Sequence, residues 1–415
     1  MINLEQYTPQ WDKKHSSFFY EYLPRIYKRR KAAGVDENIM HMQWIVIQVE
    51  TGQGIGYIAE LHLMTSYTFV SAYLCDTHKV FVLRNGKDRP VLFVIEPLSS
   101  SYSDKFTAIN ETFVRGREKP NARYLWEIFS VKDKQELHKV LHSHNIRFLQ
   151  EDRIQNAFLA HDFCLFTDPS YYTNNIVGYT DQSFADIDSL QLGEKLSLTQ
   201  EENSRIQEAK EIYNEYGFSS LVLGIDHLAS RIFSDEREDA ILEFLSMSNY
   251  YFWWAYTIED MNSSTNICRS LYTDEELHSP AKVFTANNTP FYVQTFDDKP
   301  SPTEDFVRNF GKRMHHVAYA VLDGEQANGV KNIDYVTSKL QEAHVRFLHH
   351  IVWECKDSIP DLKQIFSHSS QYSRLITEYV QRCQNFTWFF TKDNVAILTK
   401  SAWDDEKLGE CAVCD

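Results

Sequence analysis

The feature that most restricts how this chain can fold is an internal repeat. An alternating, strand-like run at 124–133 is followed by a helical pattern and then by the segment 144–149, which ends in Arg-Phe-Leu. The same order returns later, where a strand-like run at 315–323 precedes an amphipathic helix and the segment 344–348, which also ends in Arg-Phe-Leu. Two such series in the same order are typical of a duplicated chain.

A second pair of segments extends the repeat to the start of each half. The strand-like runs at 43–49 and 226–232 occupy equivalent places, and each is followed by a helical stretch. We therefore predict an α+β fold of four βαβββ modules that form two half-barrel domains. The expected segments are a helical N-terminal extension (1–40), a first half without a metal site (41–180), a helical connector (181–217), a catalytic second half (218–405) and a tail (406–415).

Length and charge exclude several classes of function. At 415 residues the chain is long enough for two or three domains of roughly 150 residues each. With 42 Lys and Arg against 58 Asp and Glu, its net charge of −16 repels phosphate backbones and anionic membranes. The polar start and the lack of a long apolar run favour a cytoplasmic protein with neither nucleic acid nor membrane as a partner. The scattered cysteines, of which only Cys411 and Cys414 are closely spaced, favour a reduced compartment over a disulfide framework.

Comparison of the two halves identifies three candidate metal ligands. His227 opens a strand at a position that Trp44 occupies in the first half, and His316 corresponds in the same way to Trp126. Indole rings cannot ligate a metal, so the repeat predicts a site in the second half alone. Glu378 alternates with apolar residues on the last strong strand, and a carboxylate on a buried face requires a compensating cation.

Two imidazoles and one carboxylate that converge from three strands form the facial triad typical of non-haem Fe(II) and O2 chemistry. Three protein ligands leave the remaining positions open for a bidentate substrate and for dioxygen. A single buried histidine can equally be a hydrogen-bonded core residue, since the chain contains 16 His. The register of the repeat is what favours the metal site over that interpretation.

The residues around these candidates resemble a known family. The matching stretches are Ile225-Asp226-His227, His316-Val317-Ala318, Gln364-Ile365-Phe366 and Glu378-Tyr379-Val380-Gln381-Arg382. Over about 219–395 the sequence looks like the vicinal-oxygen-chelate dioxygenases of the 4-hydroxyphenylpyruvate dioxygenase type, which include 4-hydroxymandelate synthase. The spacing from Gln364 to Glu378 is the most specific part, because more general members of the superfamily do not share it.

The resemblance implies that His227, His316 and Glu378 hold Fe(II). It also implies that Gln364 orients the substrate or the iron ligands by hydrogen bonding, and that Phe366 forms an aromatic wall. The implied substrate is a 2-oxo acid that chelates the iron and reacts with O2, so that oxidative decarboxylation is coupled to hydroxylation of the same molecule. The plainer interpretation is that Gln364 is an ordinary polar strand residue and Phe366 a core residue.

Three departures from the family predict an altered substrate pocket. His315 stands where the family has Gln, the segment 296–300 replaces its Asn-Glu-Pro, and the glycine-rich segment before its final helix is missing. The nearest counterpart of that last segment is 392–395, which makes Asn394 the expected substrate contact there.

The position of His315 is open to two expectations. Strand alternation sends its side chain away from the face of His316, whereas the family brings this position near the substrate. If His315 reaches the pocket, its imidazole can donate a hydrogen bond to a polar substrate tail or, when protonated, pair with an acidic one.

Other functions on the same scaffold remain open. An extradiol ring-cleaving dioxygenase would need an acid–base histidine and a tyrosine near the metal, for which His315 or His368 and Tyr319 or Tyr379 are candidates. A metal-dependent isomerase or lyase and a non-catalytic small-molecule-binding protein are the further alternatives. Because the exposed edges of such barrels often pair, the first half is also a candidate homo-oligomer interface.

Overall fold

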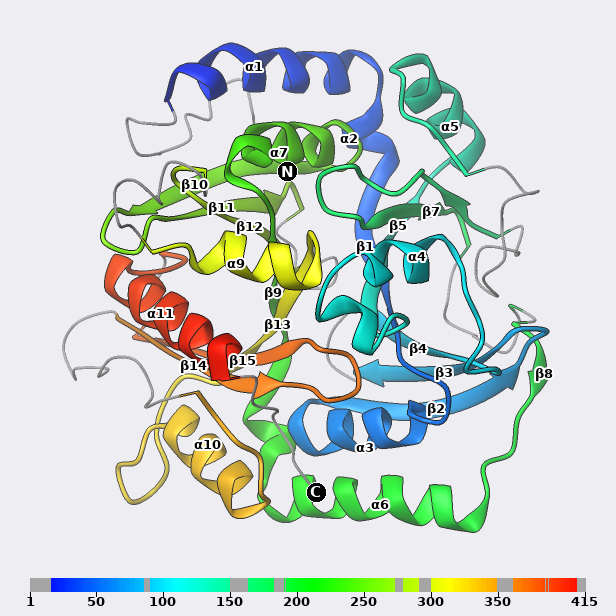
Figure 1. Cartoon of the computed structure of the whole chain (residues 1–415), viewed down its shortest axis with the longest axis vertical. Helices are drawn as coiled ribbons and strands as arrows, with labels where there is room; N and C mark the ends of the chain where they lie inside the picture. The colour runs from blue at the N-terminus through cyan, green and yellow to red at the C-terminus, as the bar shows by residue number, and fades with distance from the viewer. Residues whose placement is uncertain are drawn as a thin grey trace.

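The computed structural model divides the chain into two halves of one design, coloured blue to cyan and green to red in Figure 1. It describes residues 16–85, 90–149, 163–182, 190, 192–272, 279–290, 300–348, 361–384, 386 and 388–408.

The first half begins with two helices and continues as strands interrupted by helices. Its elements are α1 (Ser16–Ala32), α2 (Val35–Asn38), β1 (Ile39–Gln48), α3 (Gly54–Met64), β2 (Tyr67–Leu74), β3 (His78–Asn85), β4 (Val91–Pro97), α4 (Lys105–Glu111), β5 (Arg123–Val131), α5 (Lys134–Ser143), β6 (Leu165–Phe166) and β7 (Ile176–Thr180).

The connector and the second half follow the same pattern. Their elements are β8 (Glu194–Lys195), α6 (Gln200–Glu215), β9 (Val222–Arg231), α7 (Arg237–Ser246), β10 (Tyr250–Ile258), β11 (Ser263–Ser270), β12 (Ala281–Asn287), α9 (Pro302–Phe310), β13 (Arg313–Val321), α10 (Asn332–Glu342), β14 (Asp361–Ser369), β15 (Ile376–Cys383) and α11 (Lys392–Leu408).

Each half contains one mixed sheet, and the two sheets share one strand order, except that β8 of the connector adds an edge strand to the first. That order is β6-β7-β5-β1-β4-β3-β2-β8 in the first half and β14-β15-β13-β9-β12-β11-β10 in the second. The first strand of every module pairs in parallel with the last, and the two modules of a half meet through an antiparallel pair, β1 with β5 or β9 with β13. The first module of each half is a complete βαβββ unit; the second shows βαββ in the part of the chain that the structure describes. The predicted α+β fold of two half-barrel domains is confirmed.

Strand pairing also confirms the register of the repeat. His227 lies opposite Ala281, the first residue of β12, and Trp44 lies opposite Val91, the first residue of β4. On the other side, the residue two positions after His227 pairs with His316, and the residue two positions after Trp44 pairs with Trp126. The histidines of the second half and the tryptophans of the first are therefore structural equivalents.

The two halves share their largest apolar core, which includes residues of both sheets and of α3 and α7. Two tyrosine hydroxyls join the halves reciprocally. Tyr179 of β7 donates to the carbonyl of Met247 just after α7, and Tyr379 of β15 donates to the carbonyl of Met64 at the end of α3, both at 2.6 Å. Each sheet is therefore hydrogen-bonded to the end of a helix of the opposite half.

The N-terminal extension packs on the second half, where α1 lies across α7 (Figure 1). Its buried Arg30 pairs with Asp36 and donates to the carbonyls of Leu245 and Tyr250. A buried guanidinium with this many acceptors is well compensated, so it fixes the extension in place.

The connector helix α6 crosses from the first half to the second beside α3 (Figure 1). It begins at a capping box, in which the Thr199 side chain accepts from the backbone of Glu202 and the Glu202 side chain accepts from the backbone of Thr199. The capping box is a local sequence signal that explains why the helix of the connector begins at this point.

None of the described helices has the length and apolar character needed to cross a bilayer. Among the described cysteines, Cys75, Cys164 and Cys268 are free thiols, whereas Cys383 is disulfide-bonded, which the cysteine spacing did not predict.

A buried ion pair crosses the interface between the halves. The ammonium of Lys282 on β12 lies 2.6 Å from Glu127 of β5, both side chains are 1% exposed, and the Tyr124 hydroxyl donates to the other oxygen of Glu127. Lys282→Met leaves that carboxylate buried without its cation, so we expect the free energy of unfolding to fall by about 3 kcal/mol. Urea unfolding of the variant measures this loss.

The matched control for this prediction is the exposed pair Lys339–Glu342 on α10. Lys339→Met should cost less than about 1 kcal/mol. Adding Glu127→Gln to Lys282→Met should restore part of the stability, because the uncompensated charge is then gone. Equal losses for the two lysine variants would contradict a structural role for the buried pair.

Candidate metal centre and substrate pocket

Three adjacent strands of the second sheet bring His227, His316 and Glu378 together. His227 on β9 and Glu378 on β15 flank Ala318 of β13 in one row across the sheet, and His316 lies two residues earlier on β13. Alternation therefore points all three side chains to one face, and the small side chain of Ala318 leaves space between them. The His227 and Glu378 side chains are 0% and 1% exposed.

The donor atoms of these residues have the spacing of metal ligands. Glu378 Oε2 lies 3.0 Å from His227 Nε2 and 3.2 Å from His316 Nε2, and the two Nε2 atoms are 3.3 Å apart. Neighbouring ligands about 2.1 Å from one ion are about 3 Å apart in an octahedral arrangement, so the three atoms fit one face around a single ion. Among the described residues, this is the one such cluster of potential ligands.

Each of the three candidate ligands is held by an outer partner. Asp226 accepts from His227 Nδ1 at 2.8 Å, which leaves the Nε2 lone pair directed at the other two groups. Gln364 on β14 donates to Glu378 Oε1 at 2.6 Å, so that Oε2 is the oxygen presented to the histidines. His316 Nδ1 lies 2.9 Å from His315 Nδ1.

The partner of His227 is itself anchored to the segment before the last helix. Arg382 pairs with Asp226 at 2.8–3.2 Å and also donates to the carbonyls of Trp388 and Phe389. Burial by itself raises the pKa of Asp226, but the Arg382 guanidinium and the His227 imidazole outweigh this effect and hold that pKa well below its usual value. The carboxylate is therefore charged and accepts a hydrogen bond from His227 Nδ1.

A β-bulge brings His315 to the same site as its neighbour. Met314 pairs with Ser230 and His316 with the next residue of β9, so His315 is an extra residue that breaks the alternation. It lines the pocket together with His316. Burial and the charges of Arg231 and His316 keep its pKa well below the usual value. His315 is therefore neutral in the pocket without ligands, and in this form it can donate the expected hydrogen bond to a polar substrate tail.

The protonation of the two candidate histidine ligands differs. Burial by itself lowers the pKa of His227, but the carboxylates of Glu378 and Asp226 outweigh this effect and raise that pKa to about 9 in the protein without metal. Burial and the charges of His227 and Arg231 keep the pKa of His316 well below its usual value. One proton, that of His227, must consequently leave when a metal ion binds.

The raised pKa of His227 makes metal affinity depend on pH. Because Fe(II) must displace that proton, its affinity should rise about tenfold per pH unit from about pH 7 and level off above about pH 9. In the metal-free protein, the raised pKa stabilises the fold at acidic and neutral pH, and this contribution is lost as the pH rises through about 9. Anaerobic Fe(II) titrations across this range measure the slope.

The control for the pH prediction is Asp226→Asn, which removes one of the charges that raise the pKa of His227. The profile of this variant should level off at lower pH than that of the natural protein. A flat profile in the natural protein between pH 7 and 9 would mean that His227 is neutral before the metal arrives.

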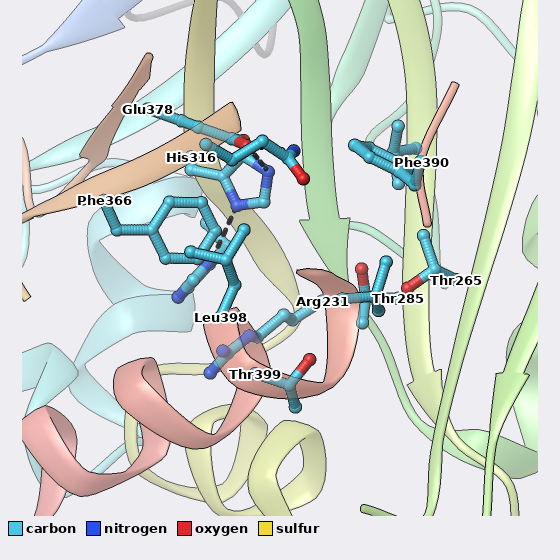
Figure 2. A pocket seen from close by; sticks show the side chains of 13 residues that line it. Arg231, Thr265, Thr285, His316, Phe366, Glu378, Phe390, Leu398 and Thr399 are labelled. Carbon is cyan, nitrogen blue, oxygen red and sulfur yellow. Dashed lines mark hydrogen bonds and ion pairs between the residues drawn. The ribbon is translucent and has the colours of Figure 1, made fainter. Parts of the chain in front are cut away.

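Two of the candidate ligands, His316 and Glu378, lie at one end of a pocket, and the third, His227, contacts both of them without being among the lining residues. The other walls of the pocket are apolar side chains, together with a group of polar ones that the sequence alone did not single out. In Figure 2, Glu378, His316 and Phe366 lie at one end, Thr285 and Thr265 lie at the other, and the side chain of Arg231 extends away from these threonines, past Thr399 of α11. No motif marks these polar residues, because only the pairing of distant strands brings them together.

The remaining candidates from the sequence have different positions. Phe366 lines the pocket, and its ring lies 4.9 Å from that of His316. Asn394 is not among the lining residues, and its amide donates to the carbonyl of Leu362 at 2.9 Å, which joins α11 to β14. Of the segment 296–300, residues 296–299 lie outside the described residues, so that departure from the family is not described.

The candidates for extradiol chemistry are mostly outside the pocket. Tyr319, Tyr379 and His368 are not among its lining residues, and the Tyr379 hydroxyl donates instead to the carbonyl of Met64 on the opposite face of the sheet. His315 alone of that set lines the pocket.

The equivalent region of the first half is filled with aromatic rings. Trp44 packs against Phe93 and Phe163, and Trp126 packs against Phe106 and Phe166. Both indoles are 0% exposed.

The counterpart of the carboxylate in the first half is Gly178. It shares a row with Trp44 and Ile128, as Glu378 does with His227 and Ala318. A Cβ atom there would lie 2.9 Å from Ile128 and 3.0 Å from Phe166. Among the described residues, these three equivalent positions of the first half therefore offer neither the donors nor the space for a metal site.

Comparison with solved structures identifies the fold. No protein-family model and no curated protein matches this sequence. The chain is similar to a triple-substituted 4-hydroxymandelate synthase from Streptomyces coelicolor, at a TM-score of 0.58 and 12% identity over 89% of this chain and 99% of the other. It is also similar to a fusion of a xylose isomerase-like TIM barrel with 4-hydroxyphenylpyruvate dioxygenase, at a TM-score of 0.55 and 11% identity over 94% of this chain and 59% of that one.

These similarities, with the two equivalent sheets, show that the chain has the vicinal-oxygen-chelate fold. Its two halves are arranged much as in the 4-hydroxymandelate synthase structure, since the match covers nearly all of both chains.

Proposed function

We propose that this protein is a non-haem Fe(II)-dependent dioxygenase that acts on a 2-oxo acid, coupling oxidative decarboxylation to hydroxylation of the same molecule. The observation that carries the proposal is the convergence of two imidazole nitrogens and one carboxylate oxygen, 3.0–3.3 Å apart, at the end of a pocket. A 2-oxo acid would chelate Fe(II) held there through its carboxylate and keto oxygens, and the ion would supply electrons to O2. The similarity to a 4-hydroxymandelate synthase and to a 4-hydroxyphenylpyruvate dioxygenase fusion supports this chemistry.

In this proposal the chain's own groups orient the ligands. Gln364 holds Glu378 Oε1 and thereby directs Oε2 to the ion, and Asp226 keeps the proton of His227 on Nδ1. His316 likewise presents Nε2, so its Nδ1–H donates to His315 Nδ1. This contact makes His315 a neutral imidazole that carries its own proton on Nε2.

The apolar walls would exclude bulk water from the reacting centre. Phe366, Phe390, Val395 and Leu398 line the pocket, and the last two come from α11. Asn394 contributes indirectly, because its amide holds α11 against β14. A dry pocket strengthens the electrostatic contacts within it and protects reactive species from hydrolysis.

The experiment that tests the proposal begins with metal analysis of the purified protein. Anaerobic addition of Fe(II) and a panel of 2-oxo acids should then give the weak visible charge-transfer band of a chelate, and oxygen should be consumed with the same acids. If catechols form a complex and no 2-oxo acid does, the protein is an extradiol-type dioxygenase. If small molecules bind without any uptake of oxygen, it is a non-catalytic binding protein.

A prediction for His315 separates substrate selection from metal binding. His315→Gln should raise KM for the natural substrate several-fold, or shift preference towards aromatic 2-oxo acids, because the imidazole lines the pocket without being a ligand. Iron stoichiometry should stay unchanged. An unaltered 2-oxo acid profile would place His315 outside the substrate contacts. A loss of iron affinity well beyond the roughly 10- to 100-fold that follows from changing an outer partner would mean that the ligand is His315 rather than His316.

A further inference from the structure

Two equivalent arginines lie where the two halves of the protein join. Arg123 is the first residue of β5, three positions before Trp126, and Arg313 is the first residue of β13, three positions before His316. Because Trp126 and His316 are structural equivalents, the two arginines are equivalents as well. They are 0% and 3% exposed, and neither is among the residues that line the pocket, so they belong to a different part of the molecule from the candidate metal centre.

Hydrogen bonds across the interface hold these arginines at the junction. Nη2 of Arg313 donates to the carbonyl of Ala122, the residue before Arg123. Nη2 of Arg123 donates to the carbonyl of Asn174 at 3.2 Å. The Asn174 amide in turn donates at 3.0 Å to the carbonyl of Lys312, the residue before Arg313. These contacts form a closed ring that fixes both guanidinium groups in place.

One nitrogen of each guanidinium is left over from this ring. Nη1 of Arg123 and Nη1 of Arg313 are buried and have no hydrogen-bond acceptor among the described residues. Buried donors without an acceptor are rare in native proteins, because each one forfeits its hydration without compensation. Two of them on equivalent residues therefore point to an acceptor that the chain itself does not supply.

The charge of this pair is not balanced by the chain either. The Nη2 atoms donate to carbonyl oxygens, which have no net charge, and none of the ion pairs within the described ranges includes Arg123 or Arg313. Burial lowers the pKa of Arg313, and the positive charges of Arg123 and Arg374 lower it further. Burial also lowers the pKa of Arg123 to about 10, although the carboxylate of Asp104 raises it. Buried cations without a counter-charge are strongly disfavoured, so the junction favours a negatively charged ligand over a neutral one.

We propose that a small inorganic anion binds between Arg123 and Arg313 and links the two halves of the protein. The anion would accept hydrogen bonds from both Nη1 atoms and supply the missing negative charge. Arg374, whose side chain is 18% exposed and pairs with Glu118, adds a further positive charge nearby. Because Nη2 of each arginine is already used, a compact ion such as chloride or phosphate suits this site better than a carboxylate, which prefers two parallel donors from one guanidinium. The inference is independent of the proposed function.

The test compares thermal unfolding of the full-length protein in different sodium salts at constant ionic strength and neutral pH. Sodium gluconate, whose anion is too large for a buried site, is the reference, and it is replaced stepwise by sodium chloride or by sodium phosphate. The midpoint temperature of the natural protein should rise in a saturable way, by roughly 3 °C at 100 times the dissociation constant. In Arg123→Met and in Arg313→Met this rise should be lost.

Methionine keeps much of the length of the buried side chain and removes its charge. Replacing a buried charge by an apolar side chain is often neutral or stabilising, so Arg313→Met should be at least as stable as the natural protein in gluconate alone. Line broadening of the chloride NMR signal is a second measurement, which requires no unfolding. The natural protein should broaden this signal more than Arg313→Met does. Removal of the excess by phosphate would show that both ions take the site, whereas an unchanged excess would identify the ligand as chloride.

The matched control is Arg237→Met. Arg237 is also a buried arginine, 7% exposed, but its guanidinium pairs with the carboxylate of Glu238. Its removal should leave the anion-dependent rise in midpoint temperature at the level of the natural protein. An equal rise in all variants would be a general effect of salt on stability and would overturn the inference. The absence of a saturable rise in the natural protein, or a rise that survives in either Arg123→Met or Arg313→Met, would overturn it as well. If one of these two variants does not fold, the other decides.

Discussion

Alanine in place of His227, His316 or Glu378 should leave the protein folded and unable to hold a stoichiometric Fe(II) ion. Each substitution removes one of only three protein donors, whose atoms lie 3.0–3.3 Å apart. The loss of affinity should exceed the roughly 10- to 100-fold that follows from changing an outer partner of a ligand. Metal analysis after anaerobic loading, together with circular dichroism, measures occupancy and fold separately.

The comparison variant for the ligands is His368→Ala. His368 is a buried histidine of the neighbouring strand β14, and it does not line the pocket. Its removal should leave iron stoichiometry at the level of the natural protein. Full occupancy in any one of the three ligand variants would exclude that residue from the centre.

Trp44→Ala and Trp126→Ala should each lower the free energy of unfolding by about 3–5 kcal/mol while iron stoichiometry is unchanged. Both indoles are fully buried and pack edge to face or tilted against phenylalanine rings, so truncation leaves large cavities among aromatic neighbours. Chemical denaturation and metal analysis of the same preparations provide the two readouts.

Replacement by phenylalanine is the matched control, because it keeps an apolar ring in the same place. Trp126→Phe should cost clearly less than Trp126→Ala. Selective loss of iron at unchanged stability in either tryptophan variant would contradict the assignment of these residues to the core of the first half.

The register of the repeat and the meeting of three candidate ligands could be predicted because both depend on simple periodicities. In a strand, residues two apart share a face. A duplicated module repeats its strand pairing, so the position of Trp44 in the first half predicts the equivalent position of His227 in the second, and Trp126 predicts that of His316. The position of His315 could not be predicted in this way. The bulge that turns His315 into the pocket inserts one residue into β13, and such an insertion cannot be predicted from simple alternation along a strand.

The far end of the pocket could not be predicted either, for a different reason. Thr285 and Thr265 become neighbours only through the pairing of β12 with β11, and neither belongs to a motif. Asn394, which was expected as a substrate contact from a resemblance in sequence position, also depends on tertiary packing. Its side chain is used to hold α11, which depends on how that helix packs.

The absence of a side chain at Gly178 has a consequence for the history of the molecule. If both halves once carried a centre, the first half cannot regain it by single substitutions. An imidazole at Trp44 or Trp126 would stand alone among aromatic rings, and a carboxylate at Gly178 would collide with Ile128 and Phe166. Every intermediate on the way back would be less stable than its parent. If a centre was lost from the first half, this loss would be difficult to reverse, and later changes of the metal site would be restricted to the second half.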